Sequence, residues 1–322
     1  MKPVLVTGAT GFLGRHLLDR LHARSEPVRV LCRGEGPPGV EVIRGDVTDA
    51  DAVNRAVAGA RAIYHLAGLV SRGAGAAQTM RRVHVEGSRL VCEAALRHGV
   101  ERVVVSSSSG AIAVSPDPVE WDETADYKSA TVARWPYYVT KIEQEKLVLG
   151  FARERGLPVI VINPSLLLGP GDDRDSSTGD IRRYLEGQIF SAPPGGLNFV
   201  DARDCAEAAA LAMERGRPGE RYLLGAVNWT MTQFIAALAR ITGRRAPWMK
   251  SPTWMSLATA PLLRAVMPML GRKFDFDDES IRMSGLFWHL DSGKARRELG
   301  FLSRDPAETL RDTIDDVRRR MH

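Results

Sequence analysis

The sequence predicts an α/β fold in which a doubly wound parallel sheet is joined to a smaller C-terminal lobe. Short apolar runs alternate with helical segments through the first half of the chain, which is typical of βαβ units. The first run leads into three glycines at intervals of three residues, followed by a helical pattern. After residue 162 the sequence becomes rich in proline and glycine, and we expect the chain to leave the sheet there.

The alternation can be followed element by element. Two predicted helices, at 88–98 and 137–155, are followed by Gly99 and Gly156, and glycine is the residue that most readily ends a helix. The predicted strands are residues 4–7, 28–32, 42–43, 62–66, 103–105 and 159–162.

We expect residues 1–164 to form the sheet domain, with one more strand returning to it near 221–225. Residues 165–322 are expected to form mainly the smaller lobe, interleaved with the sheet domain. With 322 residues, 44% of them hydrophobic and 26% charged, the chain can bury a large core. Lys and Arg (44) exceed Asp and Glu (39) only slightly and are scattered, so no nucleic-acid partner is predicted.

Three widely spaced cysteines, Cys32, Cys92 and Cys205, lack metal-ligand spacing. They predict reduced thiols in a cytoplasmic protein that binds no metal. No signal peptide precedes the first strand. The apolar stretch at 254–270 is interrupted by two prolines and an arginine, so no transmembrane segment is predicted. It is expected to form amphipathic helices over a pocket, with contact to a membrane or a lipid-like substrate as the alternative.

The glycine-rich turn has the features of a dinucleotide site. Gly8 lets the chain turn off the first strand, and Gly11 lets backbone N–H groups approach a pyrophosphate. Gly14 lets the following helix pack closely on the sheet, so the turn predicts a Rossmann domain. The expected contact residues are Gly8, Thr10, Gly11, Phe12, Leu13 and Gly14 in the turn, and Leu66, Ala67 and Gly68 at the end of the fourth strand.

The end of the second strand favours NADP(H) over NAD(H) as the cofactor. Where an acid would bind the ribose 2′-hydroxyl, the sequence has Cys32 followed by Arg33. A guanidinium pairs with a 2′-phosphate, although Arg33 could equally be a solvated charge, which leaves NAD(H) as the alternative. Asp46 and Val47, after the third strand, are expected to hold the adenine, unless Asp46 only caps a helix.

A second group of residues predicts acid–base chemistry. Four serines follow the fifth strand, at the edge where open α/β sheets bind ligands. Tyr137 and Lys141 are four residues apart on one helix face, and a neighbouring ammonium lowers the pKa of a phenol toward neutrality. We expect Tyr137 to pass a proton and Ser108 to hold and polarise a substrate oxygen.

Three segments resemble the extended short-chain dehydrogenase/reductase family of NAD-dependent epimerases and dehydratases. They read VEGSRLVCEAALRHGVERVVVSSS (85–108), NPSLLLGPGD (163–172) and GERYLLG (219–225). The resemblance covers essentially the whole chain. It is greatest for the dihydroflavonol-reductase-like branch and the bacterial hopanoid-associated sugar epimerases. It implies a parallel sheet of about seven strands and a C-terminal substrate lobe.

The resemblance also implies roles for individual residues. Ser108, Tyr137 and Lys141 correspond to a catalytic triad in which the lysine also binds the nicotinamide ribose. Pro164 corresponds to a residue near the nicotinamide ring. His84 stands where relatives carry an asparagine, and we expect it to replace that hydrogen bond, to join a proton relay or only to pack. Relatives pair through the two predicted helices given above, which implies a homodimer.

We expect an NADP-dependent oxidoreductase that reduces a ketone or aldehyde with a hydride from nicotinamide and a proton from Tyr137. The small-molecule carbonyl or alcohol substrate is expected to be hydrophobic or bulky, because the lobe is rich in large apolar residues, although these equally suit a lobe core. These residues are Trp248, Trp254, Met255, Leu257, Leu262, Leu263, Met267 and Phe287.

Two other hypotheses stay open. A nucleotide-sugar epimerase or dehydratase would need a basic cluster for a diphosphate, for which the candidates are Arg174, Arg182 and Arg183. A non-catalytic dinucleotide sensor would need no combination of serine, tyrosine and lysine. Net consumption of NADPH is expected of a reductase and not of an epimerase, so it distinguishes these two hypotheses.

Overall fold

The computed structural model describes the chain except for residues 1, 72–73, 248, 271–273, 275 and 322. Seven parallel strands form its main sheet in the order β3-β2-β1-β4-β5-β6-β9. They are β1 (Val4–Thr7), β2 (Val28–Cys32), β3 (Glu41–Arg44), β4 (Ala62–His65), β5 (Arg102–Ser106), β6 (Val159–Pro164) and β9 (Arg221–Leu224). The predicted α/β fold with a doubly wound parallel sheet is confirmed.

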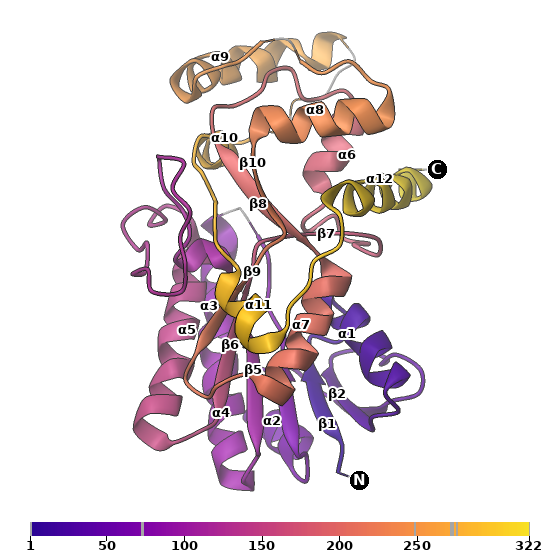
Figure 1. Cartoon of the computed structure of the whole chain (residues 1–322), viewed down its shortest axis with the longest axis vertical. Helices are drawn as coiled ribbons and strands as arrows, with labels where there is room; N and C mark the ends of the chain where they lie inside the picture. Colours follow the sequence, from indigo (N-terminus) through magenta and orange to yellow (C-terminus); the bar gives the residue numbers. More distant parts are fainter. Residues whose placement is uncertain (1, 72–73, 248, 271–273, 275, 322) are drawn as a thin grey trace.

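Helices cover both faces of this sheet (Figure 1). In β1, Val4 and Val6 contribute to the core on one face and Leu5 to the core on the other, as alternation along a strand requires. The first face is covered by α1 (Phe12–Ala23), α7 (Ala202–Arg215) and α11 (Gly293–Leu299), and the second by α2 (Ala50–Val57), α4 (Gly87–His98) and α5 (Pro136–Arg155). The short α3 (Ala77–Arg81) precedes α4.

A lobe with its own core lies beyond the carboxyl ends of the strands. Its small sheet has β8 (Gly196–Asp201) between β7 (Leu166–Leu168) and β10 (Val227–Thr230), parallel to the first and antiparallel to the second. The lobe core is closed by α6 (Gly179–Leu185), α8 (Met231–Thr242) and α12 (Pro306–Met321). Two further helices, α9 (Thr253–Val266) and α10 (Asp278–Ser284), complete it.

The chain passes between sheet and lobe several times. It enters the lobe after β6, returns as α7 and β9, and re-enters the lobe as β10. Because β9 pairs with β6, a single cut cannot separate the two parts. No helix in the described part of the chain is both long enough and apolar enough to cross a bilayer.

Candidate active site

The turn between β1 and α1 brings three backbone segments close together. Gly8 has a φ of +75°, and a Cβ there would lie 2.7 Å from the backbone nitrogen of Ala67. A Cβ on Gly14 would lie 2.2 Å from the carbonyl oxygen of Gly8, so only glycine lets α1 approach β1 this closely. No described side chain caps α1 at Gly11, which leaves its first N–H groups open to an anionic ligand.

A cavity of about 900 Å³ begins at this turn and extends into the lobe. One ligand in it can contact both the glycine turn and the acid–base side chains, as a nicotinamide dinucleotide requires. The sequence-derived candidates in its wall are Gly8, Thr10, Gly11, Phe12, Leu13, Gly14, Leu66, Gly68, Ser108, Tyr137, Lys141 and Pro164.

Four candidates lie outside this wall. The side chain of Arg33 is 78% exposed, and its Nε lies 3.9 Å from Oδ2 of Asp46. The helix cap that was the alternative role of Asp46 is supplied instead by Asp49, which caps α2. Val47 and Ala67 are buried. Arg33 and Asp46 thus lie together beside the carboxyl ends of β2 and β3, away from the acid–base side chains.

Ser108 and Tyr137 both lie in the cavity wall, and the serine hydroxyl is near enough to the phenol to act on its pKa. Tyr137 lies in the first turn of α5, with Pro136 at the start of the helix. Ser108 follows β5 with an extended backbone, and its Oγ accepts the N–H of Gly110 at 3.4 Å. Two hydroxyl groups therefore lie close enough to hold one oxygen atom of a ligand.

Lys141 lies one turn further along α5 and is buried. Its Nζ donates to the carbonyl oxygen of Ser106 at 2.8 Å and to Oε1 of Gln144 at 3.0 Å. An ammonium has three protons, so one is available to a ligand. A Cβ on Gly68 would lie only 3.7 Å from Nζ, and its absence leaves room for that ligand.

Burial controls the proton affinities of both side chains. It raises the pKa of Tyr137 to about 12, with only the neighbouring Ser108 side chain opposing it. Burial lowers the pKa of Lys141 to about 7, opposed by the charge of Glu145. The expectation that Lys141 lowers the phenol pKa toward neutrality is therefore wrong for this structure, because lost hydration outweighs the neighbouring charge. Tyr137 stays protonated at neutral pH, the form that donates a proton.

A buried ionic group behind these side chains was not expected from the sequence. Glu145 is fully buried and accepts hydrogen bonds from Arg221 at 3.1 Å and from Nδ2 of Asn163 at 2.6 Å. Asn163 also donates to the carbonyl oxygen of Ser108 at 3.1 Å, so the group holds the serine loop against β6. The one sequence feature that pointed to this ionic group was the four-residue spacing of Lys141 and Glu145, which places both on one helix face.

His84 holds two neighbouring segments through its ring. Its Nε2 accepts the N–H of Leu69 at 3.0 Å, so the proton of the neutral ring lies on Nδ1, which bonds Oγ1 of Thr140 at 2.8 Å. Burial lowers the pKa of His84 to about 2, and Lys141 adds to this effect. Of the three roles expected for His84, these contacts match the first, in which the ring replaces the hydrogen bond of an asparagine.

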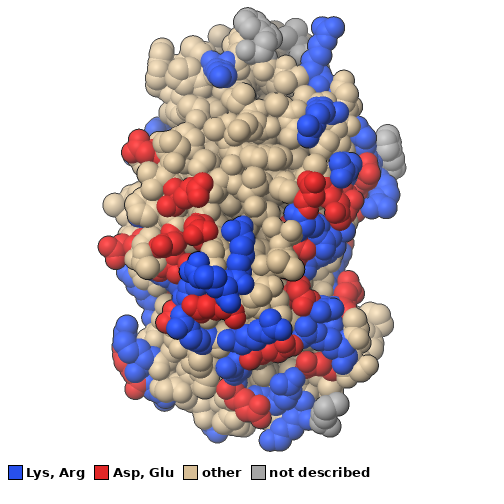
Figure 2. Space-filling model, in the orientation of Figure 1, with Lys and Arg blue, Asp and Glu red and all other residues tan. Residues whose placement is uncertain are grey.

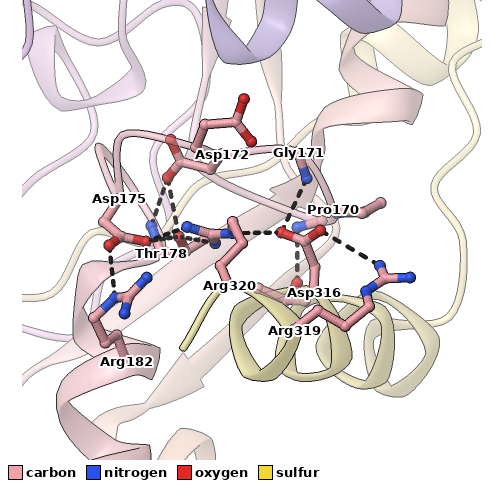
Figure 3. A network of polar contacts seen from close by, with 12 residues as sticks. Pro170, Gly171, Asp172, Asp175, Thr178, Arg182, Asp316, Arg319 and Arg320 are labelled. Atoms are coloured by element: carbon pink, nitrogen blue, oxygen red, sulfur yellow. Dashed lines mark hydrogen bonds and ion pairs between the residues drawn. The ribbon is translucent and has the colours of Figure 1, made fainter. Parts of the chain in front are cut away.

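Figure 3 shows a polar cluster that holds the loop between β7 and α6 against α12. Asp172 accepts three successive backbone N–H groups at 2.8–3.1 Å. Arg320 of α12 pairs with Asp175 at 2.6 Å and with Asp316 at 3.0 Å, and Asp316 also accepts the N–H of Gly171. Because Gly171 and Asp172 line the cavity, the C-terminal helix fixes part of its wall.

The lobe half of the cavity is mainly apolar. Its wall includes Phe190, Met231, Phe234, Ile235, Phe276, Ile281, Met283 and Trp288. Three residues there, Ser165, Gln188 and Asn198, are buried, and each has a side-chain oxygen without a hydrogen-bond partner among the described residues.

The large apolar residues expected around a substrate divide into several groups. Those in the cavity wall are Met255, Leu263 and Met267. Two residues, Leu257 and Phe287, are absent from the described wall. Trp254 and Leu262 are exposed and are absent from the described wall, so they belong neither to the wall nor to the lobe core. Trp248 lies outside the described residues.

The sheet, the glycine turn and the serine–tyrosine–lysine group define an enzyme of the extended short-chain dehydrogenase/reductase class. The model of the NAD dependent epimerase/dehydratase family matches residues 4–225, and the chain belongs to this family. The family resemblance recognised in the sequence is thereby confirmed.

Several known proteins match most of the chain. Sterol demethylase protein B of Methylococcus capsulatus is 33% identical, with 98% of each chain covered. A putative dihydroflavonol 4-reductase of Synechocystis sp. is 31% identical over 96% of this chain and 92% of the relative. A 4-hydroxy-2-methyl-3-oxo-4-farnesyl-3,4-dihydroquinoline-1-oxide ketoreductase of Stigmatella aurantiaca is 28% identical over 93% and 91%.

Solved structures show the same fold. The crystal structure of gox2253 has a TM-score of 0.85 and 31% identity, covering 99% of this chain and 98% of the other. MoeE5 in complex with UDP-glucose and NAD has a TM-score of 0.77 and 25% identity, covering 99% and 100%.

Proposed function

We propose that this enzyme uses NADPH to reduce a ketone or aldehyde group of a bulky or hydrophobic small molecule. The observation that carries the proposal is that the side chains of Ser108 and Tyr137 line the same cavity as the glycine turn. A protonated phenol and a second hydroxyl can together hold and protonate a carbonyl oxygen.

A nicotinamide dinucleotide held at the glycine turn supplies the hydride. Ser108 and Tyr137 hold the carbonyl oxygen, and Tyr137 donates its proton as negative charge develops there. Lys141 offers its remaining donor to the ribose of the dinucleotide. We propose that Pro164, at the end of β6, lies beside the nicotinamide ring.

The apolar lobe wall supports a hydrophobic substrate. Methionine and aromatic side chains surround the space beyond Tyr137. A cavity of this composition binds a largely apolar molecule and orients it by a small number of polar contacts. The names of two relatives, a ketoreductase and a putative dihydroflavonol reductase, point to the same class of reaction.

The choice of NADP(H) rests on the charge at the end of β2. Arg33 is exposed and makes only a 3.9 Å contact with Asp46, so its guanidinium can turn to a 2′-phosphate. In this proposal Asp46 and Val47 hold the adenine, and the backbone from Leu66 to Gly68 follows the ribose. NAD(H) is the alternative, as in the MoeE5 complex.

A nucleotide-sugar epimerase is the second candidate, because MoeE5 was solved with UDP-glucose and NAD. Its diphosphate requires cations that are not already paired. Arg182 pairs with Asp175 at 2.6 Å and Arg183 with Asp180 at 2.7 Å. Of the three arginines considered, Arg174 alone lines the cavity within the described chain. This arrangement favours the reductase.

Tyr137→Phe tests the proposed reaction. It removes the proton donor and keeps the ring, so NADPH oxidation with a carbonyl substrate should fall roughly 10²–10⁴-fold while NADPH binding is retained. The assay follows NADPH absorbance over a panel of aromatic and terpenoid ketones. Tyr184→Phe, which removes a buried phenol hydroxyl outside the described cavity wall, is the matched control and should keep the full rate.

Undiminished reduction by the Tyr137→Phe variant would refute the assignment. Tight NADPH binding by the native enzyme without turnover over the whole panel would favour the sensor hypothesis instead.

We also propose that the enzyme is a cytoplasmic homodimer. Its three cysteines are unpaired, which suits a reducing compartment. The long helices α4 and α5 lie side by side on one flank of the sheet and offer a surface for a second copy (Figure 1). Size-exclusion chromatography with light scattering measures the oligomeric state.

A further inference from the structure

Helix α9 carries an exposed apolar stripe at the end of the molecule farthest from the N-terminus (Figure 1). Trp254, Leu262 and Met269 are 72%, 64% and 84% exposed, the last just beyond the helix end. With Ala258 and Ala265 they recur at intervals of three or four residues and so share one face. The outer face of a helix in a globular protein is normally charged or polar, and this stripe has no charged residue.

The neighbouring face of α9 lines the cavity. Met255, Thr259, Leu263 and Met267 recur every four residues and contribute to the cavity wall. α9 is therefore a single layer between the cavity and the outside, with apolar side chains on both sides.

Positive charge is concentrated in the part of the sequence that contains this helix. Seven of the 44 Lys and Arg residues and none of the 39 Asp and Glu residues fall in 231–273, so acidic residues outnumber basic ones in the rest of the chain. Arg244, Arg245 and Lys250, just before α9, are exposed, and no described acidic side chain pairs with them. Arg264 pairs with Asp278 at the start of α10.

Figure 2 shows the same asymmetry on the visible face. At the α9 end the surface is mostly uncharged, and its charged side chains are basic. Acidic side chains begin further toward the sheet. An apolar stripe bordered by cations is complementary to a bilayer with anionic headgroups.

We propose that α9 docks on the surface of a bilayer that contains anionic phospholipid. Trp254, Leu262 and Met269 enter the boundary between headgroups and acyl chains, where tryptophan is favoured. Arg244 and Lys250 lie at the headgroups. A second copy of the chain is a poor occupant, because two such surfaces carry the same charge and repel. Docking needs no cofactor and so is independent of the proposed reaction.

Sedimentation of the full chain with lipid vesicles tests the proposal. The native protein should bind vesicles of equal parts phosphatidylcholine and phosphatidylglycerol at least about tenfold more tightly than vesicles of phosphatidylcholine alone. The triple variant Trp254→Ser, Leu262→Ser, Met269→Ser should lose at least about tenfold in binding to the mixed vesicles.

A second triple variant, Arg244→Gln, Arg245→Gln, Lys250→Gln, should bind both kinds of vesicle equally weakly. Leu302→Ser, which removes another apolar side chain that is 83% exposed, is the matched control and should bind as the native protein does. Thermal midpoints of all variants should match that of the native protein, because the changed side chains are exposed.

Two results would overturn the proposal. One is equal vesicle binding by the native protein and the apolar triple variant, including no binding by either. The other is a dimer, detected by light scattering without lipid, that the apolar triple variant dissociates, since the stripe would then belong to a second copy.

Discussion

Tyr137 and Lys141 share one face of α5, yet their pKa values shift in opposite directions, to about 12 and about 7. Burial causes both shifts, because it disfavours tyrosinate and ammonium alike. A phenol that keeps its proton is suited to protonate a carbonyl oxygen. At the residue scale, the protonated phenol therefore supports the proposed reduction.

Arg33 is the residue on which the cofactor choice depends. Arg33→Ala removes the guanidinium proposed to bind the 2′-phosphate, so KM for NADPH should rise roughly tenfold while KM for NADH changes little. Steady-state kinetics with both cofactors measure this. An equal effect on the two cofactors, or none on either, would contradict the role given to Arg33.

Single residues were predictable where their signal is local in the sequence. Tyr137 and Lys141 were correctly placed together on one helix because their four-residue spacing is a local signal. Glu145 and Asn163 were not, because their contacts join β6, β9 and α5, and Arg221 is 76 residues from the glutamate it pairs with. Only folding brings such groups together.

At the scale of elements, the contact between β1 and α1 depends on Gly14. Gly14→Ala places a Cβ 2.2 Å from the carbonyl oxygen of Gly8, and the helix must move away from the turn. We expect a stability loss of roughly 1–3 kcal/mol and weaker NADPH binding. Chemical denaturation and a fluorescence titration measure the two effects.

The matched control for that change is Gly150→Ala in the middle of α5. A Cβ there would find its nearest atom at 4.0 Å, the end of a flexible side chain. Because alanine is a better helix former than glycine, the control should gain about 0.5–1 kcal/mol. Equal losses in both variants would show that the close approach at Gly14 has no special importance.

The composition of α9 does not determine which of its side chains face the cavity. Its many apolar residues predicted a helix over a pocket. Which residues face inward depends on how α9 packs on α10, a tertiary arrangement. Met255 and Leu263 line the cavity, whereas Trp254 and Leu262 are exposed.

At the scale of the whole molecule, the C-terminal helix α12 is joined to the cavity wall by carboxylates. Burial acts to raise the pKa of Asp172, but hydrogen bonds from backbone N–H groups and hydroxyls outweigh it and lower the pKa. The pKa of Asp175 is lowered in the same way, by Arg320 and Arg182. A carboxylate with a lowered pKa contributes stability above its unfolded-state pKa of about 3.9, and this is lost as the pH falls through the folded-state value.

Asp172→Asn should therefore lower the free energy of unfolding by about 2 kcal/mol at pH 7, because the amide cannot accept the same set of N–H groups. Below pH 4 the difference from the native protein should narrow. Thermal unfolding between pH 3 and pH 7 measures it, with Asp126→Asn at an exposed carboxylate as the control. A difference that stays constant over this range would show that the charge of Asp172 is unimportant.

The overall topology was largely predictable, because apolar runs and helix-ending glycines mark each βαβ unit in turn. The short β9 was expected near 221–225, but its pairing with β6 could not be read from periodicity. The small lobe sheet was not predicted at all. Its strands have three to six residues and are separated by irregular loops, so no repeating pattern marks them.

The most direct test of the proposed reaction is the transfer of deuterium from NADPH that carries deuterium at both hydrogen positions of the nicotinamide C4. The product of a carbonyl substrate is analysed by mass spectrometry while NADPH absorbance is followed. If the enzyme is a reductase, the product alcohol carries one deuterium for each NADPH oxidised. Interconversion of a nucleotide sugar with no net oxidation of NADPH, and no labelled alcohol from any carbonyl in the panel, would contradict that account.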